Sequence, residues 1–293
     1  MTHGFGASAT LPMAAIASLA ASCESLGYDS FWLNVAGALQ GARRPDSGVP
    51  EGAPEWQAVG AQHPVDMLAA AIDATSRMTI GIGLAPIDVF PAADLVAAAR
   101  RRSWQTGRGI LGIAAGASGA RCGSRMRSSL EELRAAELPF AVGSGGRGPQ
   151  VLGMSGELAD AICLAWLTPH GLADALGHIG QGAARAAHPI PPVYAYVRVG
   201  LGEGGEERVR AEMSRYARLP HHADNREALG KAELIGVAID TPAQLPAALA
   251  PYRDARPVVR PVLESPGDLG AWEAAARDLA PGATNPATGP ATA

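Results

Sequence analysis

Several features that mark particular protein classes are scarce or absent in this sequence. Its three cysteines, Cys23, Cys122 and Cys163, are odd in number and widely spaced, which suits neither a disulfide framework nor a zinc site. No apolar run reaches the roughly 20 residues that a membrane-spanning helix needs. The N-terminus lacks the basic and hydrophobic regions of a signal peptide. We therefore expect a cytoplasmic protein that does not associate with membranes.

Charge clusters and hydrolase signatures are missing too. The net charge is −4 and no basic block occurs, so nucleic acid is not an expected partner. Neither G-x-S-x-G nor H-E-x-x-H is present, and Ser118 and Ser124 have no obvious base. His221, His222 and Asp224 lie together, but so short a cluster is more typical of a solvated loop than of a complete metal site. We predict no metal centre.

What the chain does contain is an alternation of short apolar runs and helical patterns. With 293 residues, of which 47% are hydrophobic and 18% charged, it can bury a sizeable core. The expected strands span 3–8, 30–34, 78–85, 109–114, 138–142, 161–166, 192–199 and 257–263, with a further extended segment at 235–239. The expected helices span 12–25, 64–76, 91–103, 124–136, 171–187, 206–219, 242–252 and 269–279, and another begins at Pro149.

This alternation predicts an α/β fold with a parallel sheet. Eight strands with intervening helices favour a single (β/α)8 TIM-type barrel over residues 1–280. A doubly wound sheet is the runner-up, but no dinucleotide fingerprint follows the first strand. Residues 281–293 are rich in Pro, Ala, Gly and Thr, and we expect a disordered C-terminal tail there.

Residues 35–62 interrupt the alternation. They are rich in Gly, Pro and Ala and show no period, which predicts a long loop after strand 2. In a (β/α)8 barrel, a loop that follows a strand lies at the catalytic face.

The most informative stretch is 137–169. The apolar run Leu138–Val142 predicts a buried strand, the glycine-rich run Gly143–Pro149 follows it, and a helix then begins. Such a loop binds phosphate well, because glycines let the backbone approach and helix-start N–H groups point at the anion. Arg147 would add a charge-assisted contact. The spacing matches neither G-x-G-x-x-G nor the P-loop, so a plain glycine turn is an equally good interpretation here.

The same stretch resembles the luciferase-like monooxygenase family, the flavin- and deazaflavin-dependent (β/α)8 enzymes. Members typically show a strand, A-x-G-P, a hydrophobic helix, A-G-E-x-A-D-G and an apolar strand. The matching segments are Gly146–Pro149, Ser155–Ala161 and Ile162–Trp166, followed by Leu167-Thr168-Pro169. Two more blocks, LGYDSFWLN at 26–34 and ATSRMTIGIGLAPIDVFPA at 74–92, are also similar to the family. The resemblance extends from about residue 10 to residue 280.

The resemblance implies a bound deazaflavin, coenzyme F-420, or alternatively FMN. Several short relatives with this W-L-T-P ending are described as deazaflavin-dependent, so the resemblance places coenzyme F-420 ahead of FMN. In the family the ring rests on a bulge in the third strand, often with a cis peptide between non-proline residues, and the phosphate rests on the glycine loop. Of the matching residues, Trp166 is also typical of plain packing. The implied cofactor-binding residues are Gly83, Leu84, Ala85, Ser144, Gly146, Arg147, Gly148, Trp166 and Thr168.

The resemblance also implies an oxidoreductase or monooxygenase that transfers hydride between the cofactor and a small organic substrate. Asn34 ends the second strand, where many relatives have Asn-Asp-His or Asp-His, so it is the candidate catalytic residue. Here Val35 and Ala36 replace the usual acid/base histidine. The alternative is a non-catalytic protein that binds a flavin-like ligand, or a partner subunit, that has lost its acid/base residues. Barrels of this family often pair, so a homodimer is compatible with the resemblance.

Two further polar residues receive structural interpretations. Asp160 is expected to cap or orient the turn before the sixth strand. Arg198 lies within the strand pattern VYAYVRV, and the sequence leaves open whether its side chain faces the barrel interior or the helices. If it faces inward, it needs a partner, because an unpaired buried charge is costly.

Overall fold

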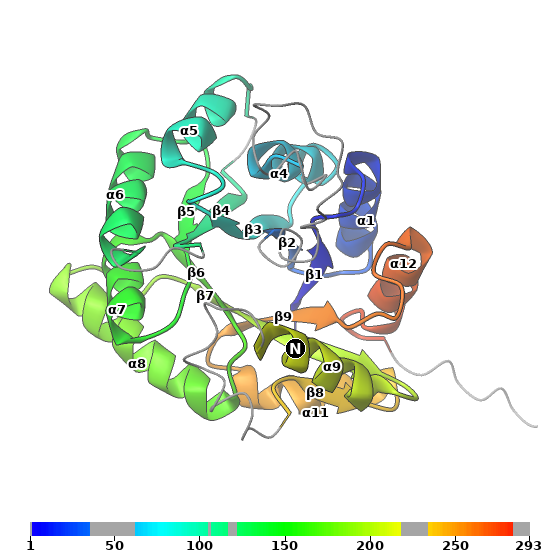
Figure 1. Ribbon diagram of the computed structural model, residues 1–293. Helices are drawn as coiled ribbons and strands as arrows, with labels where there is room; N and C mark the ends of the chain where they lie inside the picture. Colours follow the sequence, from blue (N-terminus) through cyan, green and yellow to red (C-terminus); the bar gives the residue numbers. More distant parts are fainter. Residues whose placement is uncertain (1, 36–61, 105–106, 117–121, 218–233, 284–293) are drawn as a thin grey trace, which may run out of the picture.

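Eight parallel strands close into a barrel, and a ninth strand is added outside it (Figure 1). The computed structural model describes residues 2–35, 62–104, 107–116, 122–217 and 234–283, and the strand count refers to these residues. The strand order is β6-β5-β4-β3-β2-β1-β9-β7, closed by β6 against β7, while β8 pairs with β7 alone. The strands are β1 Gly4–Ser8, β2 Ser30–Asn34, β3 Thr79–Pro86, β4 Gly109–Ala114, β5 Ala141–Ser144, β6 Ala161–Ala165, β7 Val193–Leu201, β8 Val237–Ile239 and β9 Arg256–Pro261.

Helices surround the barrel, so the expected (β/α)8 architecture is confirmed (Figure 1). The α-helices are α1 Met13–Ser25, α4 Pro64–Asp73, α5 Ala92–Arg100, α6 Cys122–Ala135, α7 Pro149–Leu158, α8 Pro169–Arg185, α9 Gly205–Ala217, α11 Leu245–Leu249 and α12 Leu269–Asp278. Two 3-10 turns, η2 Pro242–Gln244 and η3 Ala250–Tyr252, flank α11. None of the described helices is long and apolar enough to span a membrane. The predicted loop and tail lie largely outside the described residues, which omit 36–61 and 284–293.

The strands separate two apolar layers. Outward-facing side chains pack against the helices, as Phe31, Leu33 and Ile80 do against the α1 and α4 side. Inward-facing side chains fill the barrel itself, where Trp32 and Tyr194 have ring centroids 4.5 Å apart. Because successive strand residues alternate between the two layers, a single register fixes which residues can reach the barrel mouth.

Two predicted elements differ from the observed ones, and proline explains both. The fifth strand was predicted at 138–142 but spans Ala141–Ser144, since Pro139 cannot donate to the ladder while Gly143 and Ser144 pair with β4. The glycine loop therefore begins at Gly145. The helix predicted at 242–252 is divided into η2, α11 and η3, because Pro246 and Pro251 lack the N–H that a continuous helix requires.

One carboxylate fastens the turn that leads into β3. The Glu24 carboxylate, at the end of α1, accepts backbone N–H groups of Ser76, Arg77 and Met78 at 2.8–3.1 Å. Burial opposes its ionisation, but the hydrogen bonds from Arg77, Met78 and Ser76 outweigh it and lower the pKa of Glu24 to about 2. The ionised carboxylate therefore stabilises the folded protein.

We expect Glu24→Gln to lower the free energy of unfolding at pH 7 by about 1 kcal/mol, a small value because the site is solvent-exposed. A depressed folded-state pKa gives stabilisation that is complete above the unfolded value of about 4.3 and is lost as pH falls toward 2. Urea unfolding at pH 7 and pH 2.5 should show the difference between variant and parent shrinking at the lower pH. Glu132→Gln, an exposed change on α6, is the control. An equal loss at both pH values would contradict this account.

Candidate functional site

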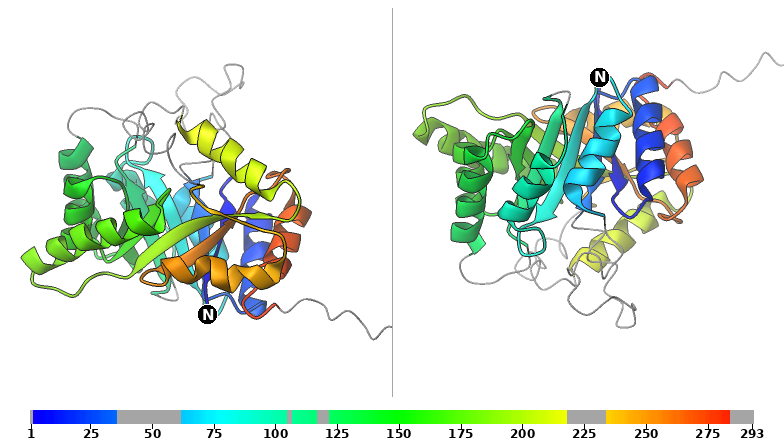
Figure 2. Two further views of the ribbon diagram at one scale, coloured as in Figure 1. Left: turned by 90° about the horizontal axis from the view of Figure 1, so that it is seen from below. Right: turned by 90° about the horizontal axis from the view of Figure 1, so that it is seen from above.

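The residues expected from the resemblance gather at one end of the barrel. All barrel strands are parallel, so their carboxyl ends share one rim, and β2, β3, β5 and β6 bring Asn34, Gly83–Ala85, Ser144 and Trp166 toward it. Figure 2 shows α9 lying across this end, opposite the N-terminus. The rim and α9 together form the candidate site.

The wall on the β3 side is bulged. Pairing with β4 slips between Ile82↔Leu111 and Ala85↔Ile113, so β3 carries one extra residue there. The Gly83–Leu84 peptide is cis, which is the expected geometry at the expected position. Gly83 faces the barrel interior, since a Cβ placed on it would lie 2.7 Å from the hydroxyl oxygen of Tyr196. Glycine at this position therefore leaves room for Tyr196 and Cys163 inside the barrel.

The glycine loop brings its backbone equally close to its neighbours. A Cβ on Gly145 would overlap the carbonyl oxygen of Cys163 in β6, so this position requires glycine. Gly148 has φ +81° and ψ 150°, a conformation essentially restricted to glycine. No side chain of the described residues caps α7, which leaves its first N–H groups available to an anion.

Arg147 and Ser144 occupy different surroundings. The Arg147 Nη2 is buried and has no hydrogen-bond partner within the described part of the chain. Burial, with a smaller contribution from the nearby charge of Arg198, lowers the pKa of Arg147 to about 10, so it remains cationic at neutral pH. Ser144 is fully buried, and its Oγ lies 2.5 Å from Ser155 Oγ in α7. The Ser144 hydroxyl thus holds the helix rather than facing the open side of the loop.

Trp166 and Thr168 have clear structural tasks. Trp166 leaves β6 with φ +61°, is 5% exposed and packs on Tyr216 of α9 with ring centroids 4.4 Å apart. The guanidinium carbon of Arg198 lies 3.4 Å from the Trp166 ring centroid, a close cation–π contact. Thr168 caps α8 by accepting the Gly171 N–H at 3.1 Å. Trp166 therefore connects the glycine-loop side of the rim to α9.

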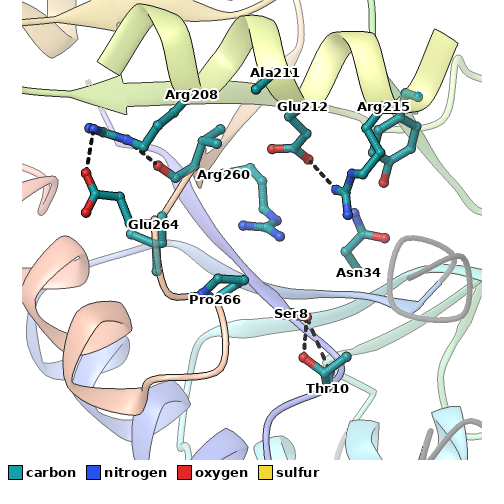
Figure 3. A pocket seen from close by; sticks show the side chains of 13 residues that line it. Ser8, Thr10, Asn34, Arg208, Ala211, Glu212, Arg215, Arg260, Glu264 and Pro266 are labelled. Carbon is teal, nitrogen blue, oxygen red and sulfur yellow. Dashed lines mark hydrogen bonds and ion pairs between the residues drawn. The ribbon is translucent and has the colours of Figure 1, made fainter. Parts of the chain in front are cut away.

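A pocket of about 660 Å³ opens between the ends of β1, β2 and β9 and helix α9 (Figure 3). Asn34 lines it, so the structure brings the candidate catalytic residue to a cavity. Figure 3 shows Arg260 reaching from β9 into the middle of this space, with Glu212 and Arg215 on α9 above it. The pocket thus contains three arginines, Arg208, Arg215 and Arg260, beside the carboxylates of Glu212 and Glu264.

Most of these pocket residues were not predicted from the sequence, which also left open the direction of the Arg198 side chain. The structure settles that question, because Arg198 follows Tyr194 and Tyr196 on the inward face of β7. Its partner is Glu212, with Nε 3.6 Å from Oε1 and both side chains under 10% exposed. Arg260 could have been noticed as the inward residue two positions after Val258, but Glu212 lies on an amphipathic helix that gives no such signal.

Of the remaining polar predictions, the structure tests the one for Asp160. The Asp160 carboxylate accepts the Val142 N–H at 2.9 Å and the Asp160 N–H donates to the Val142 carbonyl, so Asp160 orients the turn before β6 as predicted. His221, His222 and Asp224 lie outside the described residues. Within the described residues no group of histidine, cysteine and acidic side chains could hold a metal ion.

Comparison with known proteins identifies the fold through structure alone. No protein-family model matches the chain, and no curated protein sequence matches it significantly. The expected resemblance to luciferase-like enzymes is confirmed at the level of the fold, because the chain superposes on solved structures of such proteins over nearly its whole length.

Three of these structures are a dehydrogenase, a reductase and a monooxygenase. An F-420-dependent secondary alcohol dehydrogenase in complex with an F-420–acetone adduct has a TM-score of 0.67 at 12% identity, covering 93% of this chain and 96% of that one. A coenzyme F-420-dependent tetrahydromethanopterin reductase from Methanopyrus kandleri has a TM-score of 0.62 at 14% identity, covering 95% and 99%. The oxygenating constituent of 3,6-diketocamphane monooxygenase from Pseudomonas putida, in complex with FMN, has a TM-score of 0.59 at 12% identity, covering 98% and 100%.

Proposed function

We propose that this protein is an oxidoreductase that binds coenzyme F-420, or FMN as the alternative, and acts on a small organic substrate. The observation that carries the proposal is the pairing of a β3 bulge with a glycine loop at an uncapped helix start, both at the carboxyl end of the barrel. The solved structures with the same fold include proteins that bind F-420 and FMN.

The residues present fit such a cofactor. Backbone N–H groups around Gly146 and Gly148, with the cationic Arg147, would hold its phosphate. The backbone of the β3 bulge and the partly buried side chain of Leu84 would support its ring. When bound, a deazaflavin or flavin supplies the hydride-transfer chemistry itself.

The chain's own residues then have to bind and orient the substrate. In the pocket, the Asn34 amide would donate a hydrogen bond to a substrate oxygen, because it stands at the end of β2 beside the open space. The position that follows holds Val35, which is fully buried and has no ionisable group that could transfer a proton. Substrate positioning rather than proton transfer is therefore the role we assign to this strand end.

We expect Asn34→Ala to lower kcat/KM by about tenfold or more, as loss of one well-placed hydrogen-bond donor does. Cofactor affinity should not change, because Asn34 lies on the β2 side of the rim and the glycine loop follows β5. Steady-state kinetics and a cofactor titration on the same preparation separate these effects. Unchanged kcat/KM would remove Asn34 from the proposed site.

The proposal as a whole is tested by titrating the purified protein with coenzyme F-420 and, separately, with FMN, following ligand fluorescence and thermal stability. A ligand that binds only the folded state should add about 2.7 kcal/mol at a hundredfold excess over its Kd. If neither cofactor binds, the proposed function is wrong. Binding without turnover of any aldehyde, ketone or alcohol, with or without an acid group, would instead favour the non-catalytic, flavin-binding alternative.

A further inference from the structure

Two arginines stand opposite one another at the barrel mouth. Arg198 in β7 and Arg260 in β9 are register partners, and both follow inward-facing residues, Tyr196 and Val258, which are themselves paired. Arg198 is 2% exposed, whereas Arg260 is partly exposed and lines the pocket. Neighbouring strands therefore place two permanent positive charges side by side, with Arg260 in the pocket and Arg198 buried behind it against Trp166.

The carboxylates around these arginines do not balance their charge. Glu212 lies 3.6 Å from Arg198 and 3.7 Å from Arg215, so one carboxylate serves both. Glu264 is already paired with Arg208 at the rim, at 3.2 Å. Arg198, Arg215 and Arg260 thus meet a single remaining carboxylate in this part of the described chain, which leaves the pocket with an excess of positive charge.

Two donors of these arginines also lack hydrogen-bond partners. Within the described residues, Nη1 of Arg198 and Nε of Arg260 are buried and make no hydrogen bond, whereas Nε of Arg198 has only the ion pair with Glu212. Arg260 Nη1 donates to its neighbour's carbonyl, Pro261 O, at 2.7 Å, and its guanidinium lies 4.7 Å from the Trp272 ring centroid. Uncompensated buried positive charge is costly, so this arrangement favours an anion that lies in the pocket beside Arg260.

We propose that the pocket binds the acid group of a small organic anion, with Arg260 as the contacting residue and Arg198 adding charge from behind it. The inference rests on the proposed function, since it names the substrate class of that oxidoreductase as small carboxylic or similar oxyacids. A planar guanidinium pairs well with a carboxylate or phosphate, and the cavity of about 660 Å³ admits a small acid. Arg147 belongs to the glycine loop and is assigned to the cofactor instead.

The test measures anion binding directly. Calorimetric titration of the full chain with benzoate and with the isosteric neutral benzamide, at fixed ionic strength, separates charge from shape. We expect benzoate to bind at least about tenfold more tightly, the effect of a charge-assisted hydrogen bond. Arg260→Gln should abolish this preference, and Arg260→Lys should keep part of it. Arg256→Gln, an equal charge change at the opposite end of β9, should leave it unchanged. Thermal unfolding of each variant checks that it is folded.

Three results would overturn the inference: equal binding of acid and amide, no binding of benzoate, or equal loss in Arg256→Gln and Arg260→Gln. Repeating the titration with saturating cofactor distinguishes the acid group of the substrate from the phosphate of the cofactor. If the cofactor leaves benzoate affinity intact, the site belongs to the substrate, whereas displacement of benzoate would assign the arginines to the cofactor and overturn the inference. Benzoate binding in a protein that binds neither cofactor would support the anion pocket while rejecting the proposed function.

Discussion

Gly148→Asp should weaken cofactor binding by about a hundredfold. The new carboxylate would stand at the start of α7, where we place the phosphate. Two unit negative charges about 5 Å apart repel one another by roughly 3 kcal/mol at an effective dielectric constant of about 20. A difference of that size is about two orders of magnitude in Kd. The measurement is a fluorescence titration with the cofactor that binds the parent protein.

Gly148→Ala is the matched control. With φ +81° and ψ 150°, any side chain here strains the backbone by about 1–3 kcal/mol, and this cost is shared by Ala and Asp. A Cβ on Gly148 meets no other group within 4 Å, so neither variant adds a clash. The difference in cofactor Kd between the two variants therefore measures the effect of the added negative charge. If Ala and Asp weaken cofactor binding equally, the phosphate does not lie at this loop.

Gly182→Ala should destabilise the protein by about 3 kcal/mol or more, as overpacking against a rigid backbone does. Helices α7 and α8 pack through glycines, and a Cβ on Gly182 would overlap the backbone oxygen of Gly153. The clash is with backbone rather than a flexible side chain, so relief requires the two helices to move apart. Because α7 also begins at the glycine loop, cofactor affinity should fall as well.

The same helix supplies the control for this prediction. Gly177 of α8 is exposed, and a Cβ there meets nothing within 4 Å, so Gly177→Ala should stabilise the protein by about 0.5–1 kcal/mol. Urea unfolding of both variants gives the comparison. Similar free energies of unfolding for the two variants would show that α7 and α8 do not depend on the close contact between Gly182 and Gly153.

The barrel was predictable because its signals are local. Each strand is a short apolar run between turn residues, and a proline at the first helical position, such as Pro64 in α4, indicates where a helix begins. The two corrections arise where a proline interrupts an otherwise suitable pattern, as Pro139 does before β5 and Pro246 does within 242–252.

The site was predictable only in part, because its two halves depend on different information. The bulge at Gly83–Ala85 and the loop at Gly146–Gly148 lie within contiguous motifs that the resemblance matched. The pocket at the ends of β1, β2 and β9 is closed by α9, and its charge balance exists only once Arg260, Glu212 and the neighbouring Arg198 are brought together by the fold. No spacing in the sequence predicts that these three side chains lie together, although the alternation in β7 and β9 specifies which residues face inward.

The most direct test of the central claim is a crystal structure of the full chain grown with coenzyme F-420, and with FMN if that is the cofactor that binds. The account predicts density for the phosphate at the backbone N–H groups between Gly146 and the start of α7, with the ring against the bulge at Gly83–Ala85. The ring's open face should then border the pocket that holds Asn34 and Arg260. A cofactor found elsewhere on the protein, or with its phosphate bound by Arg260, would contradict the account.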